Sequence, residues 1–135
     1  YWGGFFDLEE ELRRAGHDTY TAAVGPVTSV LDLPCELYTC INGGRVDYGE
    51  AHSIKFGNER YGRTYPGLYP EWSEERKINI IGHSLGGPTG RSLIQLLEQG
   101  SPFPGQGDHP LFHHLQGIRV RRAPGHTPSH RACGI

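Results

Sequence analysis

The 135-residue chain contains no methionine, only three cysteines and no apolar run long enough to cross a membrane. It has no signal peptide and no initiator methionine, and it opens with Tyr1-Trp2-Gly3-Gly4, so we expect it to be the interior of a longer polypeptide. Thirteen basic residues against fifteen acidic ones give a net charge of −2 without a basic stripe. This balance argues against nucleic acid as a partner.

The three cysteines do not suggest a disulfide framework. Cys35 and Cys40 are five positions apart in one predicted helix, which is a poor geometry for a mutual disulfide, and Cys133 lies near the end of the chain. We therefore expect all three to be free thiols.

One stretch, residues 77–87, combines a short apolar run with a Gly-x-Ser-x-Gly motif that passes into a helical pattern. The β-branched residues before the motif predict a strand, and the apolar residues after it predict one face of a helix that ends before Gly100 and Pro102. The strand residues are Ile78, Ile80 and Ile81, and the helix residues are Leu93, Ile94, Leu96 and Leu97.

A strand that turns sharply into a helix is the setting of a nucleophile elbow. Ser84 would occupy the strained tip, and we expect Gly82 and Gly86 to remove side chains that would collide with the crossing backbone. The backbone N–H of Leu85, at the start of the helix, would then be an oxyanion donor. The alternative interpretation is an ordinary glycine turn of an α/β protein.

The rest of the chain predicts alternating helices and strands. Residues 5–15 begin with acidic side chains, end with basic ones and are followed by Gly16, which predicts a helix. A strand is expected over residues 19–24. We expect a second helix over 32–41 and a shorter one over 47–56. Residues 57–72, rich in tyrosine, glycine and proline, predict an ordered loop that either shapes a substrate cleft or plugs the core.

Several blocks occur in the order and approximate spacing of a known family. They are Tyr1-Trp2-Gly3-Gly4, Val24-Gly25-Pro26, Cys35-Glu36, Gly43-Gly44-Arg45-Val46-Asp47-Tyr48-Gly49-Glu50-Ala51-His52, Tyr61-Gly62-Arg63-Thr64-Tyr65-Pro66-Gly67 and Gly82-His83-Ser84-Leu85-Gly86-Gly87. The chain resembles the N-terminal half of the secreted triacylglycerol lipases of staphylococci and thermophilic bacilli, and of their eukaryotic relatives. The match runs from Tyr1 to about Phe112.

The resemblance implies a partial α/β-hydrolase fold over residues 1–112, with an incomplete, mostly parallel sheet flanked by helices. It implies Ser84 as the nucleophile, the Leu85 N–H as an oxyanion donor, and a lipid ester as the substrate. An extracellular location and a lipid–water interface as a partner are implied in the same way. For residues 113–135 we expect an irregular tail, disordered or frame-shifted, because no apolar period is present.

The same family carries a structural zinc ion and a calcium ion. The resemblance implies that Asp32 and His52 match two zinc ligands, whereas Asn58 stands where the family has a histidine, and the calcium site has no counterpart in this chain. Since an amide is a weak zinc ligand, too few ligands remain for a closed tetrahedral site. Without metal, Asp32 would be a helix N-cap and His52 a half-buried helix residue.

A serine nucleophile needs a histidine base and a carboxylate that orients it. Candidates follow Ser84 in the right order, but Asp108 comes only 24 residues later, too close for the intervening strands. We therefore predict that Asp108 and the later histidines are not a triad, and that His83 packs in the elbow. Those histidines are His109, His113, His114, His126 and His130. Two interpretations stay open: a serine esterase or lipase, and a truncated non-catalytic fragment of the same fold.

Overall fold

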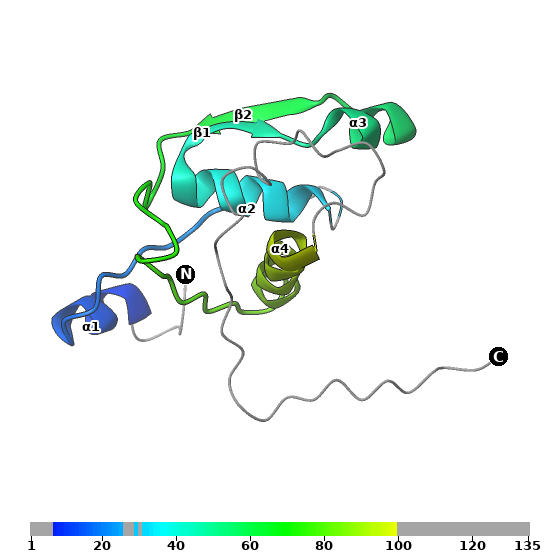
Figure 1. Cartoon of the computed structure of the whole chain (residues 1–135). Helices are drawn as coiled ribbons and strands as arrows, with labels where there is room; N and C mark the ends of the chain where they lie inside the picture. The colour runs from blue at the N-terminus through cyan, green and yellow to red at the C-terminus, as the bar shows by residue number, and fades with distance from the viewer. Residues whose placement is uncertain (1–6, 26–28, 30, 100–135) are drawn as a thin grey trace.

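The computed structural model describes residues 7–25, 29 and 31–99, and the expectations for residues 100–135 lie outside this range. The elements, in chain order, are α1 (Leu8–Arg14), α2 (Asp32–Asn42), β1 (Gly44–Asp47), α3 (Glu50–Phe56), β2 (Tyr61–Tyr65) and α4 (Gly86–Gln99). Helix α2 lies between the β1–β2 sheet on one side and α4 on the other, and α1 stands apart (Figure 1). None of the described helices has the length and apolarity that crossing a membrane requires.

Helix α1 forms where the charge pattern predicts it. Asp7 caps its N-terminus by accepting hydrogen bonds from the backbone N–H groups of Glu9 and Glu10. Ion pairs join Arg13 to Glu9 at 2.6 Å and Arg14 to Glu10, one helical turn apart. No residue of α1 is buried, so these local interactions stabilise it rather than packing.

The start of α2 differs from the expectation that Asp32 is its N-cap. Asp32 is the first helical residue and follows Leu31 at the N-cap position, which makes no side-chain capping bond. Ser29, two residues earlier, accepts the hydrogen bonds of the Leu31 and Asp32 N–H groups instead. The Ser29 hydroxyl oxygen accepts from the Asp32 N–H at 3.2 Å, while the Asp32 carboxylate accepts from the Ser29 N–H at 3.0 Å. This reciprocal pair has the form of a capping box. Pro34 lies in the first turn, where its missing N–H costs nothing.

The described sheet is an antiparallel pair of strands, separated in sequence by α3, that the sequence pattern does not reveal. Strands β1 and β2 pair antiparallel, with Gly44 opposite Tyr65 and Asp47 opposite Tyr61, and the register shifts between Arg45 and Asp47. The helix expected over 47–56 therefore begins only at Glu50, and the loop expected over 57–72 contains β2.

The two strands expected over 19–24 and at residues 78, 80 and 81 are absent from the described residues, and so is the parallel pair they would form. Both segments lack regular structure, because a strand exists only where a neighbour completes its ladder of hydrogen bonds. The side chain of Ile81 is 65% exposed, so this apolar segment has no sheet neighbour covering it within the described part of the chain.

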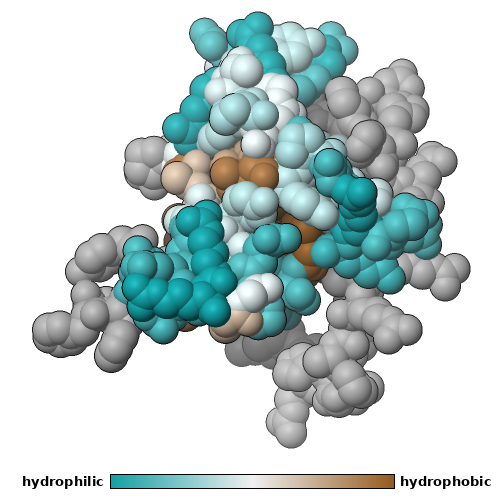
Figure 2. Space-filling view, turned by 90° about the vertical axis from the view of Figure 1, so that its left-hand side faces the viewer, coloured by the Kyte–Doolittle hydropathy of each residue, from teal (hydrophilic) through white to brown (hydrophobic). Residues whose placement is uncertain are grey.

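The core lies on the two sides of α2. On one side, Cys35 packs with Val46 of β1; on the other, Leu37 and Ile41 pack with Trp72 and Leu93. The rings of Tyr38 and Trp72 lie 6.1 Å apart between centroids, so the end of the 57–72 loop plugs the core. Cys35 and Cys40 are free and buried, in line with the predicted free thiols, whereas Cys133 lies outside the described residues. The face that carries α1 is mostly hydrophilic, with small hydrophobic patches (Figure 2).

Candidate functional site

Ser84 lies at the junction between an extended segment and α4. Its φ angle is +51°, and among the described residues it is the one non-glycine residue with a positive φ. The backbone folds tightly around it, because the N–H of Gly86 donates to the carbonyl of His83 at 2.9 Å and that of Gly87 donates to the carbonyl of Ser84 at 3.0 Å. A left-handed conformation in a residue with a side chain is strained and is typical of a functional turn. Ser84 is exposed.

The glycine before Ser84 is required by a close approach. A Cβ atom on Gly82 would lie 2.5 Å from the carbonyl oxygen of Gly86 and 2.7 Å from the nitrogen of Gly87. The backbone at Gly82 therefore passes as close to the first turn of α4 as expected, and a side chain at this position would collide. The same expectation for Gly86 is wrong, since a Cβ atom there would meet no atom within 4 Å.

Leu85 and His83 flank the serine, and both are exposed. The Leu85 N–H finds no acceptor among the described residues, while the Leu85 carbonyl accepts from the N–H of Thr89. This leaves an N–H donor next to Ser84 at the N-terminus of α4. His83 is exposed, and the packing of its side chain in the elbow stays a prediction.

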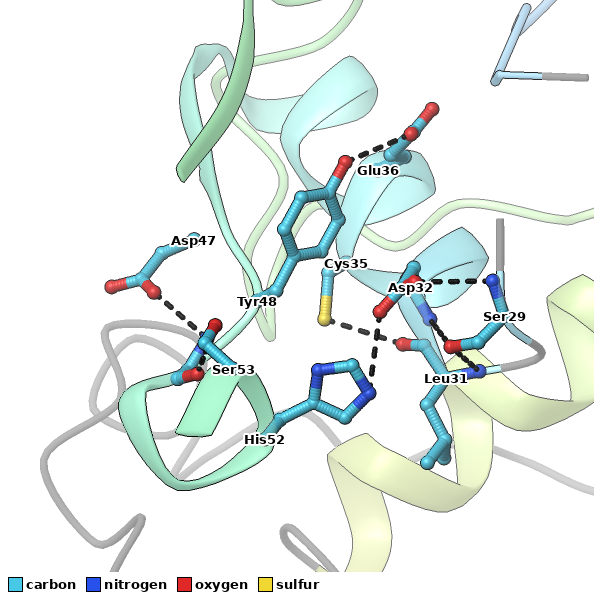
Figure 3. A network of polar contacts seen from close by, with 10 residues as sticks. Ser29, Leu31, Asp32, Cys35, Glu36, Asp47, Tyr48, His52 and Ser53 are labelled. Carbon is cyan, nitrogen blue, oxygen red and sulfur yellow. Dashed lines mark hydrogen bonds and ion pairs between the residues drawn. The ribbon is translucent and has the colours of Figure 1, made fainter. Parts of the chain in front are cut away.

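The two candidate zinc ligands meet in the structure. The Nε2 atom of His52, on α3, lies 3.4 Å from the Oδ1 atom of Asp32, on α2 (Figure 3). His52 is only 2% exposed, so it is fully buried rather than half-buried. Its ring also contacts Phe56, with centroids 4.8 Å apart. Asp32 Oδ1 is buried and accepts no hydrogen bond from the described residues.

These residues do not fit a closed zinc site. Asn58 is exposed just beyond the left-handed residue Gly57 that ends α3. Within the part of the chain that the structure describes, no group of three or more histidine, cysteine, aspartate or glutamate side chains could hold a metal ion. Asp32 and His52 supply two ligands, whereas a structural zinc site takes four.

A third group of polar residues surrounds Glu36, a residue that no sequence motif marks as functional. Glu36 is 3% exposed in the middle of α2. Its carboxylate accepts hydrogen bonds from the Gly25 N–H at 2.5 Å, Tyr48 at 3.0 Å, Arg63 at 3.0 Å and Tyr65 at 3.1 Å. The signal in the sequence is an acidic residue flanked by apolar ones in α2, at a position that must be buried.

Burial and hydrogen bonding act in opposite directions on the pKa of Glu36. Burial raises the pKa, but the four donors stabilise the ionised carboxylate and leave its pKa below the usual value. Burial, together with a hydrogen bond to Glu36, raises the pKa of Tyr65 to about 12. Burial, followed by the nearby carboxylates of Asp32, Asp47 and Glu36, raises the pKa of the Cys35 thiol to about 12.

Asp108 and the histidines of the last third of the chain, His109, His113, His114, His126 and His130, lie outside the described residues, so their exclusion from a triad stays a prediction. The structure thus places Ser84 and Leu85 together, places Asp32 with His52, and adds the Glu36 cluster.

Comparison with known proteins gives one consistent result. A family model described as "Lipase-like, C-terminal domain" matches residues 1–104. A lipase of Staphylococcus epidermidis is 47% identical over 103 residues, which are 76% of this chain and 15% of that protein. Lipase 1 of Staphylococcus aureus is 46% identical over 102 residues, 75% of this chain and 15% of that protein.

Solved structures of a protein named EstA and of a lipase are also similar to this chain. EstA from Clostridium botulinum shares 58% sequence identity with a TM-score of 0.75, covering 82% of this chain and 27% of that one. Staphylococcus hyicus lipase shares 39% identity with a TM-score of 0.73, covering 87% and 33%. The chain therefore spans about 15% of the length of these curated relatives and about a third or less of these solved structures.

Proposed function

This chain belongs to the family of lipase-like C-terminal domains, and from that membership we propose that it carries the nucleophile of a carboxylic-ester hydrolase that acts on acylglycerols. The names of its relatives support a lipase-type ester hydrolase. The serine mechanism, the substrate and the roles of the residues are our proposal.

The observation that carries the proposal is the conformation of Ser84. A positive φ in a non-glycine residue costs roughly 1–3 kcal/mol and persists only where the surrounding structure imposes it. Here the approach of Gly82 to the first turn of α4 imposes it. The result is an exposed hydroxyl at the start of a helix, the arrangement that a nucleophilic serine requires.

In the proposed reaction, Ser84 Oγ attacks the carbonyl carbon of the ester while a histidine base takes its proton. The negative charge that develops on the carbonyl oxygen is stabilised by the N–H of Leu85, aided by the dipole of α4. The alcohol leaves with the proton from the histidine, and water then hydrolyses the acyl-enzyme. The base and its orienting carboxylate lie outside the described residues.

A lipid ester as substrate implies work at a lipid–water interface, and we propose an extracellular location by analogy with the family that the sequence resembles. The Asp32–His52 pair takes no part in the proposed chemistry. It joins α2 to α3, and neither helix contains Ser84.

The proposal is tested by labelling Ser84 with a fluorophosphonate in the longest natural polypeptide that contains this sequence, and by assaying tributyrin hydrolysis. We expect both signals in the wild type and neither in Ser84→Ala. Ser73→Ala is a matched control, because Ser73 lies in a loop and its hydroxyl contacts Glu75. Folded wild-type protein that takes up no label would overturn the proposal and favour a non-catalytic fragment.

A further inference from the structure

Glu36 is the point at which three segments distant in sequence are fastened to α2. The Gly25 N–H comes from the segment before α2, Tyr48 follows β1, and Arg63 and Tyr65 belong to β2. One carboxylate oxygen accepts from Tyr48, and the other accepts from the remaining three donors. Figure 3 shows Tyr48 reaching across to Glu36.

The donors favour an ionised carboxylate. The backbone N–H of Gly25 and the guanidinium of Arg63 can only donate, so neither can accept a proton carried by Glu36. If Tyr48 rotates to accept that proton, the second oxygen still accepts from Gly25, Arg63 and Tyr65. Without the negative charge these three hydrogen bonds are weaker, and Arg63 loses its ion-pair partner.

Two glycines make room for this cluster. A Cβ atom on Gly25 would lie 3.0 and 3.1 Å from the two carboxylate oxygens of Glu36. A Cβ atom on Gly62 would lie 2.6 Å from the Tyr48 hydroxyl oxygen and 3.0 Å from the tyrosine ring. A larger residue at either position would have to displace the Glu36 carboxylate or the Tyr48 side chain, so both glycines leave room for the cluster.

The charged and titratable groups that face Glu36 come from β2, from the turn after β1 and from α2 itself. They are Arg63 and Tyr65 from β2, Tyr48 from the turn after β1, and Cys35 and Cys40 from α2. Among these described residues only Arg63 is positive. Its side chain is 51% exposed, against 5% for that of Glu36, so it cannot by itself keep a buried carboxylate ionised.

We propose that Glu36 is an ionisation-dependent latch, whose carboxylate holds the β1–β2 sheet and the Gly25 segment against α2 and releases them when it is protonated. The latch does not depend on the proposed ester hydrolysis. Because the pKa of Glu36 in the folded chain is lowered, the stabilisation is complete above the usual glutamate pKa and is lost as the pH falls through the folded value.

The test is hydrogen exchange of the Gly25 amide in the full chain, expressed relative to the intrinsic exchange rate at each pH, with the amides of Leu93 and Leu96 in α4 as an internal reference. In the wild type we expect Gly25 to be protected at pH 7 and to lose protection below about pH 4.5 while the reference amides stay protected. In Glu36→Gln, Gly25 should exchange at least about tenfold faster at pH 7 and without the pH dependence.

Tyr48→Phe and Tyr65→Phe keep the proposal testable if Glu36→Gln does not fold. Each removes one donor and leaves the charge, so the folded pKa should rise and release should occur about one pH unit higher. Unchanged Gly25 protection in Glu36→Gln, an unmoved midpoint in both tyrosine variants, or loss of the reference amides at the same pH would each overturn the latch.

Discussion

The backbone of Gly82 crosses that of Gly86 so closely that a Cβ atom on Gly82 would lie 2.5 Å from the Gly86 carbonyl oxygen. This approach forces the chain to reverse direction within four residues. Ser84, at the midpoint of the reversal, takes the positive φ of +51°. The strain at Ser84 and the crossing at Gly82 are therefore two parts of one feature.

Gly82→Ala should remove the elbow while Gly86→Ala should not. The alanine methyl at 82 meets backbone atoms that cannot rotate away, so we expect a loss of about 1–3 kcal/mol in the free energy of unfolding and a loss of fluorophosphonate labelling at Ser84. At 86 the methyl meets open space in the first turn of α4, so stability and labelling should be kept. Equal effects of the two substitutions would contradict the crossing.

Leu93→Ala should be among the most destabilising single substitutions in the described core. Leu93 is 0% exposed and packs with Leu37, Ile41 and Trp72, so truncation leaves a cavity and costs about 2–5 kcal/mol. Ile54→Ala is the control: that side chain is 76% exposed, and its truncation should cost less than about 0.5 kcal/mol. Urea unfolding measures both. A Leu93 variant as stable as the Ile54 variant would mean that the α2–α4 contact does not form in solution.

Asn58→His should raise the affinity of the chain for zinc. Asp32 and His52 already converge at 3.4 Å, and a second histidine would supply a third ligand, with water as the fourth. Zinc at 100 times its dissociation constant would stabilise the variant by about 2.7 kcal/mol. The thermal midpoint with and without zinc is the measurement.

The double variant Asn58→His, His52→Ala is the control for the zinc experiment, and it should respond like the wild type. Metal analysis after dialysis shows whether the wild-type protein also holds zinc. A stoichiometric amount of zinc would mean that residues outside the described ranges supply the missing ligands.

Cys35 should resist alkylation in the folded chain. With a pKa of about 12, on the order of one thiol in ten thousand is ionised at pH 8, compared with roughly a quarter for an unperturbed cysteine. Iodoacetamide at pH 8 should therefore modify Cys35 at least about a thousandfold more slowly in native than in denatured protein. Peptide mass analysis separates Cys35 from the other cysteines. Rapid modification of Cys35 under native conditions would show that the α2–β1 core opens.

The local elements could be predicted because their determinants are close together in sequence. The change from acidic to basic residues predicts α1, and the helical pattern after Asp32 predicts α2. The turn is predicted by Gly82 and Ser84, which lie within four residues of Gly86. In each case the interacting groups are within about one helical turn of each other, so neighbouring residues alone decide the conformation.

The two predicted strands show the limit of that reasoning. A β-branched pattern indicates that residues 19–24 and 78–81 can extend, but a strand needs a partner, and β1 and β2 are the pair that the described residues form. The donors that meet Glu36 lie 11, 12, 27 and 29 residues away from it. His52 and Asp32 meet across α2 and α3 in the same way.

The sequence by itself therefore determined the helices, the turn at Ser84 and the family, because these rest on neighbouring residues and on short blocks in a fixed order. The tertiary structure decided which strands pair, that a side chain would collide at Gly82 but not at Gly86, and that a buried glutamate joins three segments. These depend on which distant groups are brought together when the chain closes its loops, and a local pattern carries no information about that choice.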